Sequence, residues 1–183
     1  MAPLLSELLE KQRYRAIQPY LHGEVLDLGC GVAKVVALLQ PGQRYVGVEN
    51  QPAFLGWLKE NRPEYEFHAR DLDEDELGLD TRFDTILMTA VVEHLKKPDR
   101  LLSQLPQHLK PGGRVVITTP TPLGDWIHKA GARLGLFYLE AAQAHETIFT
   151  RATLQARLHR HGLSCVHYRR FLLGCNQLFV CEA

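Results

Sequence analysis

The 183-residue sequence is poor in cysteine and methionine, and it has no long apolar run. Its four cysteines are Cys30, Cys165, Cys175 and Cys181. They lack the spacings of metal ligands and do not suggest a disulfide framework, so we expect buried thiols in a reducing compartment. No segment has the apolar length of a membrane span, and charged residues in the first turns are unlike a signal peptide. These absences predict a cytoplasmic protein without a transmembrane segment.

Neither sign of charge is in excess. Lysine and arginine together number 21, as do aspartate and glutamate, so the formal net charge is zero. This balance gives no general attraction to nucleic acid or to an anionic membrane. A small-molecule substrate is therefore favoured over nucleic acid, while the oligomeric state is left open.

Strand-like and helix-like segments alternate along most of the chain. The predicted strands are residues 24–28, 45–48, 65–68, 83–88 and 114–118, and the helices between them are 32–40, 52–61 and 98–109. This alternation predicts a parallel sheet with right-handed crossovers and helices on both faces. Residues 163–171 and 177–181 are strands joined by so few residues that they must pair antiparallel. We expect one α/β domain over residues 1–183, with residues 1–22 as an N-terminal helix.

Polar residues follow the first three predicted strands, at the edge where open α/β sheets bind ligands. The first strand leads into a glycine turn, which lets the backbone approach a ligand closely. Glu49 ends the second strand, where a carboxylate can accept hydrogen bonds from both ribose hydroxyls. Asp71 follows the third strand and can accept from an adenine amino group. The candidate cofactor-binding residues are Asp27, Gly29, Gly31, Glu49, Asn50, Gln51, Asp71, Leu72 and Thr89.

Two kinds of ligand fit such a sheet edge: a dinucleotide, or a nucleoside that carries an amino-acid tail. The dinucleotide fingerprint needs a third glycine at the position of Lys34, and its pyrophosphate would be repelled by Asp27. The ammonium of an amino-acid tail can instead pair with Asp27, directly or through water. The sequence therefore favours the nucleoside with an amino-acid tail over a nicotinamide dinucleotide.

The segments Val25–Gly31, Phe83-Asp84 and Lys110-Pro-Gly-Gly113, together with Glu49 and Asp71, resemble class I S-adenosylmethionine-dependent methyltransferases. The resemblance extends over nearly the whole chain. It implies a Rossmann-like methyltransferase fold with seven strands in the order 3-2-1-4-5-7-6, strand 7 being antiparallel. It also implies S-adenosylmethionine as cofactor and S-adenosylhomocysteine as product. Ala33 stands where many members of this family have a third glycine.

Two histidines are candidate catalytic residues. His94 follows the fourth strand, beside the expected methyl donor, and a histidine titrates in the range that suits a base. His145 precedes Thr150, a predicted helix N-cap, and can face the same site. Packing roles are as plausible for either residue. His145 belongs to residues 119–150, which we expect to form a lid-like insertion that mixes apolar and basic residues between the fifth strand and the last helix.

The pair Glu93-His94 with the later His145 also resembles two metal-dependent groups, one methylating ubiquinone precursors and the other the 3′ ends of small RNAs. Both groups use a Glu-x-x-Glu-His pattern. Ala90 stands at the first glutamate position, so one ligand is missing and no metal is predicted.

The sequence thus predicts a small-molecule methyltransferase, similar to the ubiquinone-biosynthesis type, that transfers a methyl group to oxygen or nitrogen by in-line displacement. Two alternatives stay open: an RNA methyltransferase, and a catalytically silent partner protein that binds the cofactor. The sequence does not identify the methyl acceptor.

Overall fold

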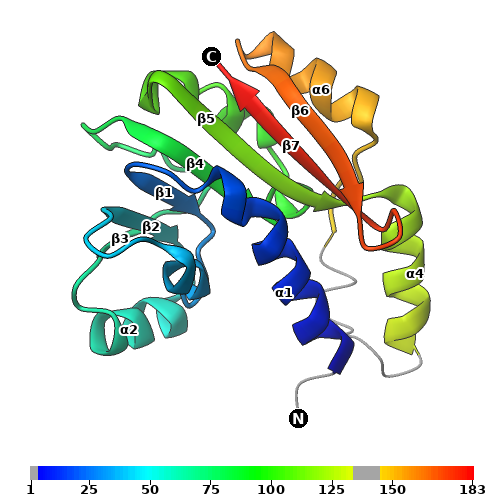
Figure 1. Ribbon diagram of the computed structural model, residues 1–183, viewed down its shortest axis with the longest axis horizontal. Helices are drawn as coiled ribbons and strands as arrows, with labels where there is room; N and C mark the ends of the chain where they lie inside the picture. Colours follow the sequence, from blue (N-terminus) through cyan, green and yellow to red (C-terminus); the bar gives the residue numbers. More distant parts are fainter. Residues whose placement is uncertain (1–3, 134–144) are drawn as a thin grey trace.

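The computed structural model describes residues 4–133 and 145–183. A seven-stranded sheet forms the centre, in the order β3-β2-β1-β4-β5-β7-β6 (Figure 1). The strands are β1 (Val25–Leu28), β2 (Tyr45–Glu49), β3 (Glu66–Ala69), β4 (Phe83–Thr89), β5 (Leu109–Pro120), β6 (Ser164–Phe171) and β7 (Asn176–Glu182). β1 to β5 pair in parallel, whereas β7 is antiparallel to both β5 and β6. The predicted strand order and the reversed tail pair are confirmed.

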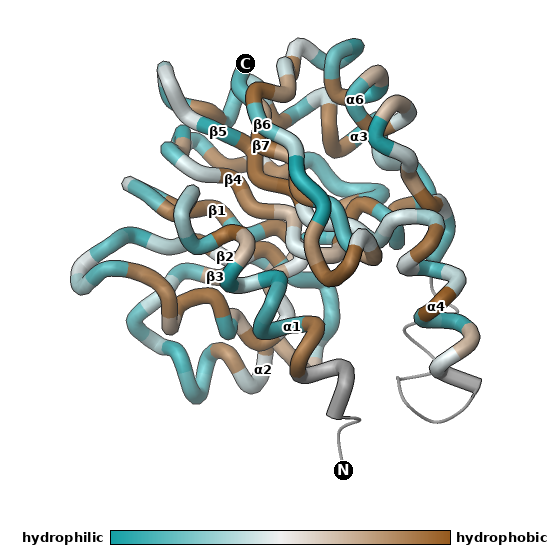
Figure 2. Tube along the Cα trace, turned by 45° about the vertical axis from the view of Figure 1, so that its right-hand side comes forward, coloured by the Kyte–Doolittle hydropathy of each residue, from teal (hydrophilic) through white to brown (hydrophobic). Residues whose placement is uncertain are grey.

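Burial along the strands follows their place in the sheet. Every residue of β1 and β2 is buried, while β3 and β6, at the two edges, are mostly part-exposed or exposed. Central strands of a parallel sheet are covered on both faces and are therefore mostly apolar. Figure 2 shows this apolar centre as brown strands enclosed by more polar helices.

Helices cover both faces of the sheet, as predicted. Ile17 of α1 (Leu4–Ile17) and Leu58 of α2 (Pro52–Asn61) are buried in the core of one face. Leu101 of α3 (Pro98–Leu102) and Leu154 of α6 (Arg151–Arg160) are buried in the core of the other. α4 (Pro122–Arg133) follows β5 and, like α1, extends past the same end of the sheet (Figures 1 and 2).

Three local expectations were wrong. The predicted helix 32–40 is only a short 3-10 helix, η2 (Lys34–Leu38), and the predicted helix 98–109 ends at Leu102. A separate 3-10 turn begins at Pro106, which has no backbone N–H to continue an α-helix. Cys165 and Cys181 form a disulfide, because antiparallel β6 and β7 place them directly opposite each other.

The insertion predicted at 119–150 is described in part. α4 forms its first half, where the Trp126 side chain is 68% exposed. Residues 134–144, which include most of the apolar stretch expected to cover the site, lie outside the described residues. Within the described part of the chain, no helix has the length and apolarity needed to cross a membrane.

Replacing Gly124 with alanine tests how tightly α4 packs on the β6–β7 turn. A Cβ at this position would collide with the backbone carbonyl of Cys175. We expect Gly124→Ala to lower the free energy of unfolding by about 1–3 kcal/mol, measured by urea denaturation. Gly56→Ala is the matched control, because nothing lies within 4 Å of a Cβ there and alanine favours the helix. Equal stability of the two variants would contradict the close packing of α4.

Candidate functional site

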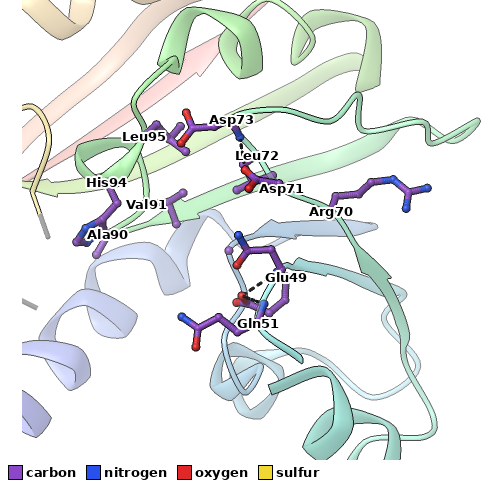
Figure 3. Close-up of a pocket in the computed structure, with 12 residues that line it drawn as sticks. Glu49, Gln51, Arg70, Asp71, Leu72, Asp73, Ala90, Val91, His94 and Leu95 are labelled. Carbon is purple, nitrogen blue, oxygen red and sulfur yellow. Dashed lines mark hydrogen bonds between the residues drawn. The ribbon is translucent and has the colours of Figure 1, made fainter. Parts of the chain in front are cut away.

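A cavity of about 460 Å³ lies at the carboxyl ends of β1 to β4 (Figure 3). The loop after β4 forms one side of it, and the turn after β2 forms another. The lining residues are Gly29, Glu49, Asn50, Gln51, Arg70, Asp71, Leu72, Asp73, Ala90, Val91, His94 and Leu95. A mixed polar and apolar lining of this size suits a nucleoside-sized ligand.

The glycine turn after β1 adopts a backbone that other residues take with difficulty. Gly29 and Gly31 have φ values of 70° and 56°. A Cβ on Gly29 would lie 2.7 Å from the Val91 side chain, whereas Gly31 faces open space. Ala33, at the position of the family's third glycine, has φ 52° and therefore carries some of the strain that glycine avoids. Lys34 does not face the cavity; it pairs with Glu10 of α1.

The Glu49 carboxylate links the glycine turn after β1 to the turn after β2. One oxygen, Oε2, accepts a hydrogen bond from the Gly31 N–H at 2.9 Å. The other, Oε1, accepts from the N–H groups of Asn50 and Gln51 at 2.8 and 3.0 Å. A carboxylate has about four lone-pair positions, so capacity remains for a ligand hydroxyl. Glu49 is thus held in one orientation at the wall of the cavity.

The acidic loop after β3 closes a third side of the cavity. Asp71 accepts a hydrogen bond from the Asp73 N–H at 2.9 Å, which tightens the loop into a turn. The Asp73 carboxylate accepts from the N–H groups of Lys96 and Lys97, at the start of α3. Asp73 therefore holds the loop after β3 against the loop after β4 by hydrogen bonds. The sequence analysis did not assign this role.

Asp27 does not line this cavity. Its side chain is buried and accepts a hydrogen bond from the Tyr45 hydroxyl at 2.8 Å. Burial raises the pKa of Asp27 to about 7; the Tyr45 hydrogen bond opposes this shift, and the negative charge of Glu49 adds to it. Any contact with a cofactor ammonium would have to pass through water or a small rearrangement.

His94 and His145 lie side by side, with ring centroids 5.0 Å apart. His94 ends η3 (Val92–His94) and lines the cavity. His145 is brought beside it because the N–H groups of Glu146 and Thr147 both donate to the backbone carbonyl of Glu93. The structure therefore brings together the two histidines that the sequence placed 51 positions apart.

Asp125 of α4 fixes the orientation of His145. Its Oδ1 lies 2.6 Å from His145 Nδ1, and its Oδ2 pairs with Lys129 at 2.9 Å. Burial opposes ionisation, but the bonds with His145 and Lys129 hold the pKa of Asp125 below its usual value. Because an ionised carboxylate only accepts, His145 Nδ1 donates to Asp125, and in a neutral imidazole with this proton the lone pair lies on Nε2.

A second pocket of about 210 Å³ adjoins His145, between α1, α4 and the β6–β7 turn. Leu9, Ile127 and Leu172 make most of it apolar, and Arg13 and His128 add basic groups. Burial lowers the pKa of His128, and the neighbouring His145 and Arg13 lower it further. His145 lines this pocket and His94 lines the larger cavity, so the histidine pair lies between the two.

The structure thus gathers most of the predicted cofactor residues around one cavity. The predicted residues that line it are Gly29, Glu49, Asn50, Gln51, Asp71 and Leu72. Three predicted residues do not: Gly31 acts through Glu49, Asp27 is buried against Tyr45, and Thr89 pairs within the sheet. The lining residues that sequence reasoning missed are Arg70, Asp73, Ala90, Val91 and Leu95. The signal for Arg70 and Ala90 was their place directly after a strand, and the other three lie in the loops that follow.

Residues 1–168 match the family model of a methyltransferase domain. The chain is 31% identical over 114 residues to a tRNA U34 carboxymethyltransferase of Pseudoalteromonas translucida, covering 60% of this chain and 35% of the relative. It is also 31% identical over 107 residues to a trans-aconitate 2-methyltransferase of Deinococcus radiodurans, covering 56% and 39%. A solved S-adenosylmethionine-dependent methyltransferase from Mesorhizobium loti superposes with a TM-score of 0.74 at 18% identity, covering 95% and 97% of the two chains.

Fold, cavity and family match agree that the chain belongs to the methyltransferase domain family. The predicted class, an S-adenosylmethionine-dependent methyltransferase, is confirmed at this level. The chain spans well under half of the length of the two curated relatives described above.

Asp27 gives the fold a pH dependence that can be measured. Its pKa in the folded protein, about 7, lies above the ordinary value of 3.8. Well below pH 3.8 the group is neutral in both states, whereas above pH 7 folding buries a charge at a cost of about 4 kcal/mol. We expect the stability of Asp27→Asn relative to wild type to rise between pH 4 and 7, measured by urea denaturation.

Tyr45→Phe is the companion variant. It removes the hydroxyl that stabilises the charged form of Asp27, so its stability should fall more steeply with pH than that of the wild type. A stability difference between Asp27→Asn and wild type that is the same at pH 4.5 and pH 8 would show that burial does not perturb Asp27.

Proposed function

We propose that this protein transfers the methyl group of S-adenosylmethionine to an oxygen or nitrogen atom of a small molecule. The observation that carries the proposal is the position of the histidine pair. His94 lines the polar cavity at the strand ends, and His145 lines the small apolar pocket beside it. A methyl donor in the first cavity and an acceptor in the second would meet at these two rings.

The cofactor is proposed to lie in the larger cavity, along the segments that follow β1, β2 and β3. Glu49 would accept hydrogen bonds from the ribose hydroxyls, since its carboxylate already has a fixed orientation. Leu72 would pack against the adenine ring, and Asp71 would accept from the adenine amino group. The methionine part would pass over the Gly29–Gly31 turn, where Gly31 faces open space.

The chemistry requires alignment more than activation. A lone pair of the acceptor forms a bond to the methyl carbon while the carbon–sulfur bond breaks, and its electron pair remains on sulfur as S-adenosylhomocysteine. Alignment of the two reactants supplies on the order of 7–11 kcal/mol of the barrier reduction. If the acceptor carries a proton, the Nε2 lone pair of His145 can accept it, because Asp125 holds the proton on Nδ1.

The properties of the smaller pocket support a small acceptor. Its apolar wall and the guanidinium of Arg13 suit a compact apolar molecule with an anionic group. Arg13 itself donates to Asn176, so it is held in place.

RNA methylation is the second candidate, since one relative described above is a tRNA-modifying enzyme. The sequence has two basic pairs, Lys96-Lys97 and Arg169-Arg170, and one member of each is engaged with the protein itself. Lys97 pairs with Glu74, and Arg169 donates to the backbone carbonyl of Ala16. These contacts favour the small-molecule acceptor. A protein that binds the cofactor without catalysis is the third candidate.

Calorimetry with S-adenosylmethionine, S-adenosylhomocysteine and NAD tests the cofactor assignment. We expect the first two to bind and NAD not to bind. Glu49→Gln should weaken binding by about 10- to 100-fold, the effect of losing a charged hydrogen bond. Glu60→Gln, an exposed residue of α2, is the matched control. Binding of NAD alone, or unchanged affinity in Glu49→Gln, would reverse the assignment.

The histidines are tested by turnover. His94→Ala and His145→Ala should leave the affinity for S-adenosylhomocysteine unchanged and slow methyl transfer by about 100-fold or more. Release of S-adenosylhomocysteine is measured by mass spectrometry with pools of small hydroxyl and amine acceptors, and separately with tRNA. His161→Ala, a partly buried histidine paired with Asp99, is the control. Turnover with tRNA alone would select the RNA candidate, and cofactor binding without turnover would select the silent one.

A further inference from the structure

The Glu93 carboxylate is buried without a hydrogen-bond partner. Its side chain is 0% exposed, and neither Oε1 nor Oε2 has a partner in the described part of the chain. Transfer of an unpaired charge out of water is unfavourable, so buried carboxylates are normally matched by a cation or by hydrogen-bond donors. The described residues supply no donor in contact with Glu93, and we therefore expect a ligand to supply one.

Arg13 of α1 does not act as that donor. It feels the negative charge of Glu93, which opposes the lowering of the Arg13 pKa by burial. Its guanidinium nevertheless donates to Asn176, and it forms no hydrogen bond with Glu93. Arg13 also lines the smaller, apolar pocket. The region around this pocket thus has one negative and one positive side chain that do not pair directly.

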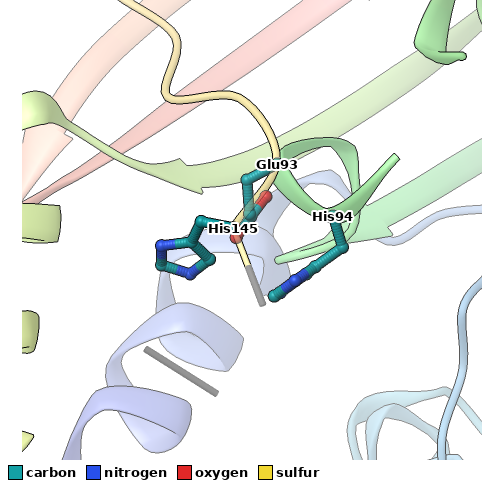
Figure 4. Close-up of side chains that lie close together, drawn as sticks. All are labelled: Glu93, His94 and His145. Atoms are coloured by element: carbon teal, nitrogen blue, oxygen red, sulfur yellow. The ribbon is translucent and has the colours of Figure 1, made fainter. Parts of the chain in front are cut away.

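Glu93 lies close to both members of the histidine pair. One of its carboxylate oxygens and one ring nitrogen each of His94 and His145 all lie within 4.8 Å of one another. Figure 4 shows the Glu93 carboxylate between the two histidine side chains. A tetrahedral nitrogen that donates two hydrogen bonds of about 2.9 Å holds its two acceptors about 4.7 Å apart. The cluster is therefore of the right size for a carboxylate and an imidazole to share one amine nitrogen.

We propose that the methyl acceptor is an amine and that Glu93 binds its nitrogen atom. This inference rests on the proposed function, which leaves oxygen and nitrogen open, and it selects nitrogen. One N–H of the amine would donate to Glu93, and a second would donate to Nε2 of His145, because Asp125 accepts the Nδ1 proton. These two hydrogen bonds would fix the direction of the nitrogen lone pair that attacks the methyl carbon.

The negative charge of Glu93 favours nitrogen over oxygen. As the amine attacks, a nitrogen–carbon bond forms and the carbon–sulfur bond breaks, with its electron pair left on sulfur. The positive charge thereby moves from sulfur to nitrogen, where a buried carboxylate stabilises it as it develops. The surplus proton of the methylated nitrogen then passes to Nε2 of His145 and on to solvent. A phenolate or carboxylate oxygen at the same place would instead be repelled by Glu93.

Arg13 extends the assignment to the far end of the acceptor. A guanidinium binds a carboxylate through charge-assisted hydrogen bonds, and the pocket that Arg13 lines has a volume of about 210 Å³. The substrate class is therefore a compact amine with an apolar body and an anionic group. We choose para-aminomethylbenzoate as the probe, and para-hydroxymethylbenzoate as its oxygen counterpart on the same skeleton.

The test compares amines with hydroxyl compounds of the same skeleton, starting from this pair and extending to pools of compact amines, alcohols, phenols and carboxylic acids. Binding to the complex with S-adenosylhomocysteine is measured by calorimetry, and methyl transfer by mass spectrometry. We expect amines to be methylated about 100-fold faster than their hydroxyl counterparts. Glu93→Gln should lower kcat/KM for amines by about 100-fold and leave the affinity for S-adenosylhomocysteine unchanged. Glu60→Gln is the control, with kcat/KM equal to that of the wild type.

The melting temperature of Glu93→Gln separates ligand binding from folding. The variant removes an unpaired buried charge, so its melting temperature without ligand should equal or exceed that of the wild type. A lower melting temperature would show that the polypeptide already supplies a partner for Glu93, which would overturn the proposal.

Two further results would overturn the nitrogen assignment. One is methylation of oxygen acceptors in place of amines, or of amines at equal kcat/KM by Glu93→Gln and wild type; the other is the absence of binding by every amine in the pools. Methylation of oxygen acceptors would leave the proposed function intact. Failure of the wild type to bind S-adenosylhomocysteine would instead count against the proposed function itself.

Discussion

The candidate site depends on the three backbone hydrogen bonds that the Glu49 carboxylate accepts. They hold the glycine turn after β1 and the turn after β2 at a fixed distance, and a cavity remains between them. Because Glu49 ends a fully buried strand, its own position is set by the core of the sheet. A carboxylate fixed in this way needs no reorganisation when hydroxyl groups of a ligand arrive, which favours binding.

The fold and this cavity could be predicted from the sequence because both follow from local patterns. Buried strands such as Val25–Leu28 are mostly apolar, and the residue that follows each parallel strand falls at the same edge of the sheet. This reasoning found Glu49, Asp71 and the glycine turn. It did not foresee the surroundings of Asp27, whose place in the sequence does not reveal that its side chain accepts a hydrogen bond from Tyr45 in the core. Contact between Asp27 and the cofactor stays a prediction.

The surroundings of the histidine pair could not be predicted to the same extent, because they are built from contacts between distant segments. His145 reaches Glu93 through two backbone hydrogen bonds from the residues that follow it, and Asp125 comes from another helix. No periodicity in the sequence encodes these meetings. The disulfide between Cys165 and Cys181 was missed for a related reason, since it depends on the register of β6 against β7.

A crystal structure of the protein with S-adenosylhomocysteine tests the central claim most directly. Our account predicts the ribose hydroxyls on Glu49, the adenine ring against Leu72, and the sulfur atom on the side of the cavity nearest His94. A ligand bound elsewhere, or one whose ribose makes no contact with Glu49, would contradict it.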